Sequence, residues 1–438
     1  MSRPMRRSGV PWIGLLPEEW RVVPFRHVFA ESPEVNGARP VGVMLSVSGY
    51  RGVEPKEYEH ESQRRSDDML ETYRVVRPGQ LAVNTMWMNY AGLGVSEHLG
   101  HVSPAYRAYD FRARCDRRFI HYLMRSEAYV RAYTGCLRGI RPNSLQMDRA
   151  TLMSWPILLP PIDEQRDIAD YLDRETARIG MLIEEQQRLI AMLRERRTAL
   201  VDSTLTQGLD VEELRATGNT WLPDLPASWR VTRAKHVLSY GPQNGISPQA
   251  GDSDDTKSLS LGAIREGRVN MHSDVTKYVD GAEISDLEDY SLHSGDILLV
   301  RGNGNIDLVG RAGLVGPEFS ACTYIYPDLL IRVRTSASML PDFFVWACNA
   351  NATRAQVRAN ARTAVGTFKV AGGDVRSLVL PLPPLETQAA IVAHLKEQTA
   401  KIDHLIMETE RFIELSRERR SALITAAVTG QIDVREVA

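Results

Sequence analysis

The chain has 438 residues, more than one hydrophobic core usually supports, so two or more domains are expected. Apolar residues make up 43% and charged residues 25%, which is typical of soluble globular proteins. The net charge of −2 does not by itself indicate a nucleic-acid binder. No apolar run of signal-peptide or membrane-span length follows the basic start, Met1 to Arg7, and this predicts a cytoplasmic location.

An internal repeat organises the chain. Residues 159–211 align with residues 382–434 without a gap, and 23 of the 53 aligned positions are identical. Upstream, the segment that starts at residue 12, WIGLLPEEWRV, corresponds to the segment that starts at residue 221, WLPDLPASWRV. The shift grows from 209 there to 223 while the order is kept, so one ancestral unit was duplicated and its second copy gained loops.

The first copy begins with an N-terminal segment, residues 1–19, and a variable domain, residues 20–158. Its composition predicts a mixed α/β domain with short strands at Val75 to Val83 and Asp110 to Arg114. Asparagine and arginine pair with the edges of adenine and guanine, so the polar segments after the strands are candidate DNA contacts, although a polar turn is the plain alternative. The candidates here are Asn84, Trp87, Asn89, Tyr90, Arg138, Arg141 and Asn143.

A long helix follows at residues 159–208 and returns in the second copy at residues 382–430. Pro160 and Pro161 end the preceding strand, and apolar residues then recur at intervals of three, four and seven positions from Ile168 to Leu200. Gly208 and Gly430 mark the ends of the two helices. A lone helix cannot bury such a stripe, so we expect the two helices to pack antiparallel; packing of each on its own domain is the alternative.

The second variable domain, residues 209–381, has predicted strands at Gly295 to Val300 and Leu329 to Val333, and a tail follows the distal helix at residues 431–438. The segment from Arg354 to Arg376 holds four arginines and a lysine against one acid, a local basic stripe able to neutralise phosphates. The candidate DNA contacts in this domain are Arg301, Asn303, Asn305, Arg311, Arg362 and Lys369.

Sequence signatures of catalysis are missing. No Gly-x-x-x-x-Gly-Lys phosphate loop occurs, and Pro-Pro occurs only after leucine, not in the form with which amino-methyltransferases grip a flipped base. The ten histidines show no metal-ligand spacing. We therefore expect no catalytic residue, metal site or cofactor in this chain, and we expect it not to be an enzyme.

The sequence resembles the specificity subunits of type I restriction-modification enzymes. The resemblance rests on the duplicated helices LPPIDEQ…LRERRTALV and LPPLETQ…SRERRSALI, on the two tryptophan-containing openings, and on the tracts MWMNYAGLGVSEHLGHVSPAYRAY and RGNGNIDLVGRAGLVG. It implies an α+β fold: two mixed α/β target-recognition domains separated by two long helices that form an antiparallel coiled coil with an internal pseudo-two-fold repeat.

The resemblance also implies a function. Each recognition domain would read one half of a bipartite, asymmetric site in double-stranded DNA, while the helices set the spacing and dock two methyltransferase subunits. S-adenosylmethionine, ATP and Mg would belong to those subunits and to restriction-translocase subunits that join the complex. Two alternatives stay open: a duplicated coiled-coil scaffold that binds proteins without DNA specificity, and a specificity module of a restriction system with other subunits.

Overall fold

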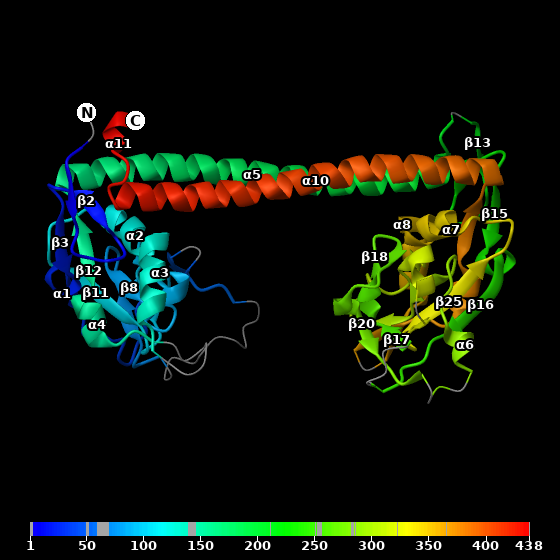
Figure 1. The fold of residues 1–438 in the computed structure, drawn as a ribbon, viewed down its shortest axis with the longest axis horizontal. Coiled ribbons are helices and arrows are strands. Elements are labelled where there is room, and N and C mark those ends of the chain that lie inside the picture. The colour runs from blue at the N-terminus through cyan, green and yellow to red at the C-terminus, as the bar shows by residue number, and fades with distance from the viewer. Residues whose placement is uncertain are drawn as a thin grey trace. The chain divides into compact units, whose positions relative to one another are not determined.

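The computed structural model describes residues 3–49, 52–58, 70–138, 146–210, 212–249, 251, 256–281, 284, 286–321, 323–364 and 366–437. The chain divides into two compact units (Figure 1). Unit 1 comprises Met1–Gln187 and Glu410–Ala438, and unit 2 comprises Arg188–Thr409. Each unit therefore contains a variable domain together with one part of each long helix.

The long helices are α5 (Ile162–Gln207) and α10 (Leu385–Val428). A buried glutamine fixes the beginning of each, because Gln165 donates to the carbonyl of Pro160 at 2.8 Å and Gln388 donates to that of Pro383 at 2.9 Å. Each helix is followed by a glycine with positive φ, Gly208 or Gly430, a conformation that favours glycine at helix ends.

The two helices pack antiparallel within each unit. In unit 1, Leu172 near the beginning of α5 lies in the same core as Val428 at the end of α10. In unit 2, Leu205 near the end of α5 lies in the same core as Leu395 near the beginning of α10. Arg197 of α5 also binds Asp403 of α10 there, with 2.8 Å between Nε and Oδ1. The predicted antiparallel pairing is confirmed.

Unit 1 is a mixed α/β domain around two four-stranded sheets, ordered β6-β5-β10-β7 and β4-β11-β8-β9, with the pairs β1-β2 and β3-β12. Its strands are β1 (Met5–Arg7), β2 (Leu15–Pro17), β3 (Arg21–Pro24), β4 (Phe29–Glu31), β5 (Val43–Ser48), β6 (Gly52–Pro55), β7 (Arg74–Val76), β8 (Leu81–Val83), β9 (Leu93–Val95), β10 (Gly100–Val102), β11 (Arg107–Phe111) and β12 (Pro156–Leu159). Its short helices are α1 (Phe25–Val28), α2 (Arg117–Arg125), α3 (Glu127–Cys136), α4 (Arg149–Ser154) and α11 (Val434–Val437).

Unit 2 repeats this frame. The order β16-β25-β21-β23 matches β4-β11-β8-β9 and continues into β19-β18, and the sheets β20-β17-β24 and β22-β27-β26 and the pairs β13-β14 and β15-β28 complete the unit. Its strands are β13 (Leu214–Ala216), β14 (Asp224–Pro226), β15 (Arg230–Arg233), β16 (Leu238–Asn244), β17 (Thr256–Leu259), β18 (Ile264–Arg265), β19 (Arg268–Val269), β20 (Thr276–Tyr278), β21 (Ile297–Val300), β22 (Gly302–Asn303), β23 (Ala312–Leu314), β24 (Thr323–Ile325), β25 (Leu330–Thr335), β26 (Arg362–Ala364), β27 (Thr367–Lys369) and β28 (Val379–Leu382). Its short helices are α6 (Leu287–Tyr290), α7 (Pro341–Asn349), α8 (Asn351–Asn360) and α9 (Gly372–Ser377).

The prediction of one strand from Val75 to Val83 is wrong. The chain turns at Gly79, whose φ is +86°, so that β7 and β8 belong to different sheets. The strand predicted from Asp110 to Arg114 begins earlier, at Arg107, and ends at Phe111, because Phe111 lies opposite Phe29, where its partner strand β4 begins.

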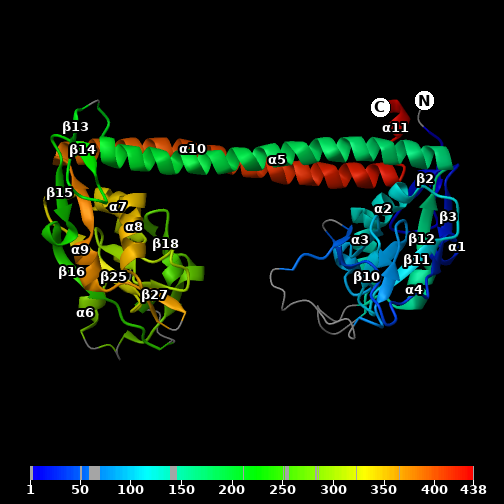
Figure 2. The ribbon, with the colours of Figure 1, turned by 180° about the vertical axis from the view of Figure 1, so that it is seen from behind.

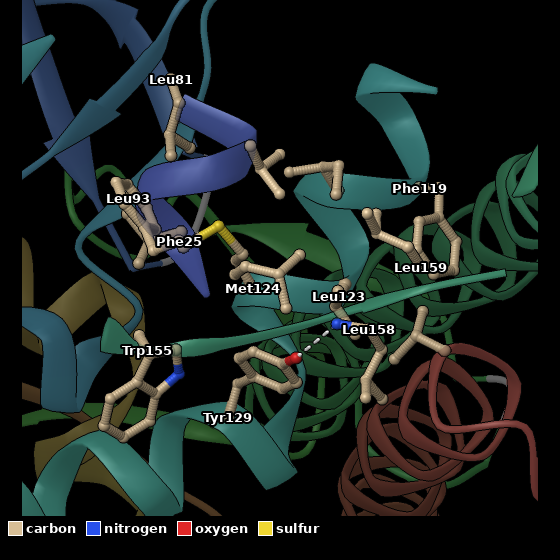
Figure 3. Close-up of a cluster of buried hydrophobic side chains, with 14 of the residues drawn as sticks. Phe25, Leu81, Leu93, Phe119, Leu123, Met124, Tyr129, Trp155, Leu158 and Leu159 are labelled. Carbon is tan, nitrogen blue, oxygen red and sulfur yellow. Dashed lines mark hydrogen bonds between the residues drawn. The ribbon is translucent and has the colours of Figure 1, made fainter. Parts of the chain in front are cut away.

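The core of unit 1 lies between the sheets, helices α2 and α3, and the long helices. Figure 3 shows Phe25, Leu123 and Leu158 in this cluster, all fully buried. The hydroxyl of Tyr129 accepts a hydrogen bond of 3.3 Å from the backbone N–H of Leu158, so the one polar atom of that buried ring is satisfied. Among the residues that the structure describes, no helix is long and apolar enough to cross a membrane.

Candidate nucleic-acid interface

The first candidate surface is the loop Asn84–Gly92 between β8 and β9, here called loop 1. The backbone N–H of Asn84 donates to Gly92 at 2.7 Å, and its side-chain oxygen accepts from Met86 at 3.2 Å. Asn84 is only 2% exposed, so it shapes loop 1 from within. A Cβ on Gly92 would lie 2.7 Å from the carbonyl oxygen of Trp87, and the loop can close this tightly because Gly92 has none.

Two aromatic side chains stand at the tip of loop 1. Trp87 is 52% exposed and Tyr90 is 61% exposed, with 5.6 Å between their ring centroids. Asn89 lies between them, and the described residues offer its buried Oδ1 atom no hydrogen-bond partner. Exposed aromatic rings beside an amide can stack on bases and bind their edges.

A second predicted segment of unit 1 lies against loop 1. Exposed Arg138 pairs with Gln146 through two backbone hydrogen bonds of 3.1 and 2.9 Å. Gln146 in turn donates from its side chain to the hydroxyl of Thr85 at 3.2 Å, inside loop 1. The structure thus brings Arg138 to the loop of Trp87 and Tyr90, whereas Arg141 and Asn143 lie outside the described residues.

A buried arginine anchors loop 1. The guanidinium of Arg125, the last residue of α2, donates to four carbonyls: Ala91 at 2.9 Å, Leu93 at 2.5 Å, Gly49 at 2.8 Å and Ser48 at 3.2 Å. Burial, and to a lesser extent the nearby charge of Arg420, lower the pKa of Arg125 to about 10. The carbonyls keep the group charged in this site by replacing water as hydrogen-bond acceptors.

Unit 2 carries the equivalent surface on the segment Arg301–Arg311, here called loop 2, between β21 and β23. Asn303 accepts from the backbone of Asn305 at 2.9 Å, and Asn305 accepts from Asp307 at 2.9 Å. Arg301 donates to the carbonyl of Asp328 at 3.1 Å, and exposed Arg311 donates to that of Asp307 at 3.1 Å. These hydrogen bonds hold the fold of the loop, and Asn305 and Arg311 remain exposed.

The second predicted segment of unit 2 pairs directly with loop 2. In the sheet β22-β27-β26, Gly302 is opposite Lys369 and Asn303 is opposite Phe368, while Lys369 is also opposite Arg362. Arg362 and Lys369 are both exposed. Two cations and a polar loop thus form one surface, which suits contacts with phosphates and base edges together.

Loop 2 has anchors of its own. Arg354 of α8, which is 6% exposed, donates to the carbonyls of Val309 and, at 3.0 Å, Asp307. Burial lowers its pKa to about 10. Asn349, the last residue of α7, exchanges two hydrogen bonds of 3.0 and 2.9 Å with the backbone of Ala312. Helix α2 therefore holds loop 1, and helices α7 and α8 hold loop 2 and the strand that follows it.

Among the described residues, no three or more histidines, cysteines, aspartates or glutamates are grouped so that they could hold a metal ion.

Known proteins resemble this chain in sequence. No family model matches the chain. The specificity subunit of the type I restriction enzyme EcoKI from Escherichia coli strain K12 is 23% identical over 324 residues, 72% of this chain. The alignment spans 65% of that relative, just under two thirds of its length. The chain is thus similar in sequence to a type I restriction specificity subunit.

Solved structures of type I systems share the fold. The HsdS subunit of Thermoanaerobacter tengcongensis superposes with a TM-score of 0.52 at 15% identity, covering 95% of this chain and 98% of that one. A chain from a structural study of type I complex assembly and conformational transition superposes with a TM-score of 0.70 at 16% identity, covering 95% and 99%. At these identities the likeness concerns the fold, and the predicted fold class is confirmed.

Sequence reasoning missed the anchoring residues of the two loops. Arg125 and Arg354 fall in stretches rich in exposed arginines, and nothing local separates a buried arginine from a surface one. A charged residue flanked by apolar helix positions, such as Leu123 and Met124 before Arg125, is the weak signal that the sequence offers.

Proposed function

We propose that this chain is the sequence-specific DNA-binding subunit of a type I restriction-modification complex. The domains of residues 20–158 and 209–381 would each read one half of a bipartite, asymmetric site. Loops 1 and 2 would make the base contacts, with Arg138 in one unit and Arg311, Arg362 and Lys369 in the other placed near phosphates. The observation that carries the proposal is that two units with one frame present two dissimilar polar loops at the same position.

The long helices would serve assembly. We place on them the docking of two methyltransferase subunits that bind S-adenosylmethionine, joined by restriction-translocase subunits that use ATP and Mg. The helices would also set the spacing between the two half-sites, since both run from one unit into the other. This chain would contribute no catalytic group, so methyl transfer, ATP hydrolysis and cleavage would all require its partners.

The test is to map methylated bases genome-wide in cells that carry this chain with its methyltransferase partner. The expected result is a motif of two fixed half-sites separated by unspecified bases. The purified complex should also bind a duplex carrying that motif with an affinity that falls as salt rises, by a slope of about 0.9 per neutralised phosphate.

Sequence-independent retention of DNA, or methylation that persists without this chain, would favour a protein scaffold instead. Turnover by the chain purified alone would contradict its non-catalytic role.

A further inference from the structure

The repeat places two equivalent tryptophan sites in the molecule, one at the end of a long helix in each unit. In unit 1, Trp20 packs against Gly430, and a Cβ on that glycine would lie 3.3 Å from the ring. In unit 2, Trp229 packs against Gly208, where a Cβ would again lie 3.3 Å from the ring. Both tryptophans are 1% exposed. The two sites share one backbone frame and can be compared directly.

The unit 1 site is filled by an arginine of this chain. The guanidinium of Arg3 lies 5.7 Å from the ring centroid of Trp20 and binds both carboxylate oxygens of Glu164, one of them at 2.7 Å. Glu164 also accepts from the indole N–H of Trp20 at 3.1 Å. The side chains of Arg3 and Glu164 are only 16% and 7% exposed, and the bond to Glu164 raises the pKa of Arg3. An arginine between a tryptophan face and a carboxylate is thus built into this site.

The unit 2 site is hollow. A cavity of about 250 Å³ lies beside Trp229, lined by Gln207, Gly208, Leu209, Asp210, Glu212, Glu386, Thr387 and Ala390. By the shift of 209 Glu212 corresponds to Arg3, and by the shift of 223 it corresponds to Arg435. Thr387 corresponds to Glu164 by the shift of 223. The arginine that fills the unit 1 site is therefore absent here, and its position holds a carboxylate.

The charge of the cavity is unbalanced. Three of the described residues that line the cavity are acidic, namely Asp210, Glu212 and Glu386. No described lining residue is basic. Glu212 accepts a hydrogen bond of 2.8 Å from Ser228, which fixes one of its oxygens. In unit 1 the residue equivalent to Asp210 is Asp433, whose charge is matched by Arg435 at 2.7 Å. Carboxylates around a tryptophan favour a weakly hydrated planar cation.

We propose that this cavity of unit 2 is a docking pocket for an arginine side chain of a methyltransferase subunit. The arginine would lie against Trp229 as Arg3 lies against Trp20, with its guanidinium paired to Glu212 and Glu386. The choice of partner rests on the proposed function, whereas the choice of an arginine rests on the occupied site in unit 1. The pocket lies where α5 ends and α10 begins, on the helices that we assign to assembly.

The first measurement tests the pocket without any partner. Nα-acetyl-arginine amide is titrated into the full chain labelled with 5-fluorotryptophan, and the ¹⁹F signal of Trp229 is assigned through Trp229→Phe. We expect a saturable shift with a Kd of about 1–10 mM, typical of a single weak ion-paired contact. The neutral isostere Nα-acetyl-citrulline amide should leave that signal in place. Absence of a saturable shift, or an equal response to citrulline, overturns the proposal.

Two variants separate the pocket from general charge effects. Glu212→Arg restores the residue found in unit 1, fills the cavity from within, and should weaken binding of the arginine probe by at least about tenfold. Glu213→Arg makes the same charge change at an exposed neighbour that does not line the cavity, and should leave binding within about twofold. Glu386→Gln removes one carboxylate without filling the cavity and covers the case in which Glu212→Arg fails to fold.

The second measurement tests the partner. Association of the methyltransferase subunit with the full chain should weaken by at least about tenfold in Glu212→Arg and remain unchanged in Glu213→Arg. Equal association of both variants overturns the assignment to that subunit. If the wild-type chain does not bind the subunit, the proposed function fails, and the probe titration still decides whether the pocket takes an arginine.

Discussion

Replacing Arg125 by alanine should loosen loop 1 without removing any group that faces DNA. The guanidinium joins four carbonyls from two separate segments, Ser48 and Gly49 on one side and Ala91 and Leu93 on the other. Without it, these carbonyls lose their donor, and loop 1 loses its tie to the segment after β5. The exposed pair Trp87 and Tyr90 would then no longer be held in one arrangement.

The magnitude follows from two opposing contributions. Four hydrogen bonds to a charged group contribute about 6 kcal/mol at the lower end of about 1.5 kcal/mol each. Burial and the nearby charge of Arg420 oppose this, because a pKa lowered to about 10 corresponds to about 3 kcal/mol against the charged form. The difference predicts that Arg125→Ala costs about 3 kcal/mol. Because the hydrogen bonds contribute more than burial costs, the substitution should be destabilising.

Hydrogen exchange measures the effect locally. The amide of Asn84 donates to Gly92 and the amide of Gly92 donates to Trp87, so both report on closure of loop 1. A loss of about 3 kcal/mol would raise their exchange rates by about a hundredfold. Arg125→Lys should lie between the wild type and alanine, because an ammonium reaches fewer of the carbonyls.

Arg131→Ala is the matched control, since Arg131 is 80% exposed and pairs only with Glu127 one helical turn away among the contacts described. It should change exchange in loop 1 by less than about threefold. In methylation mapping, Arg125→Ala should relax one half-site and leave the other unchanged, and Arg354→Ala should do the reverse. Unchanged exchange in Arg125→Ala would refute the reasoning, as would equal relaxation of both half-sites.

Three further predictions concern base reading, spacing and pH. Arg301→Ala or Asn303→Ala should relax discrimination in one half-site by about 1–3 kcal/mol per lost base contact, and equal changes in both halves of the methylated motif would contradict one domain for one half. A four-residue insertion after Leu200 lengthens α5 by about 6 Å and turns its end by about 40°. The mapped methylation sites should then keep both half-sites and gain about two base pairs of spacer. An unchanged spacer in an active variant would mean that the helices do not set the spacing. Burial and the nearby charge of Arg125 hold the pKa of His121 at about 4 in the folded chain. As the pH falls from about 6.5 to 4, His121 therefore takes up a proton in the unfolded chain but not in the folded chain. Stability should therefore fall over that range by about 3 kcal/mol, and His121→Gln should flatten the corresponding decline in Tm.

The sequence by itself determined the frame of this protein. The two long helices could be predicted because their signals are local: a Pro-Pro stop, an apolar stripe at helical spacing, and a glycine after the last turn. The duplication could be predicted because 23 identities over 53 positions need no structure to be seen. The pairing of the helices followed from the stripe, since each needs an apolar partner.

The candidate surface was only partly visible in the sequence. The residue types drew attention to loop 1 and loop 2, but the sequence could not distinguish Asn84, which is 2% exposed, from Trp87, which is 52% exposed, three positions later. A turn reverses the chain between them, and exposure is then set by what packs on each side. The same limitation produced the wrong single strand from Val75 to Val83, because the turn at Gly79 sends its two halves into different sheets.

Tertiary structure alone decided which distant segments meet. Gln146 reaches Thr85 across 61 positions of the chain, and Arg125 reaches Gly49 across 76. Such contacts leave no periodic trace, because they join single side chains to backbone atoms. The hollow tryptophan site has the same origin. Glu212 is an unremarkable surface acid in the sequence, and its meaning appears only when folding brings Trp229 and Glu386 beside it and Arg3 is seen to fill the equivalent place in the other unit.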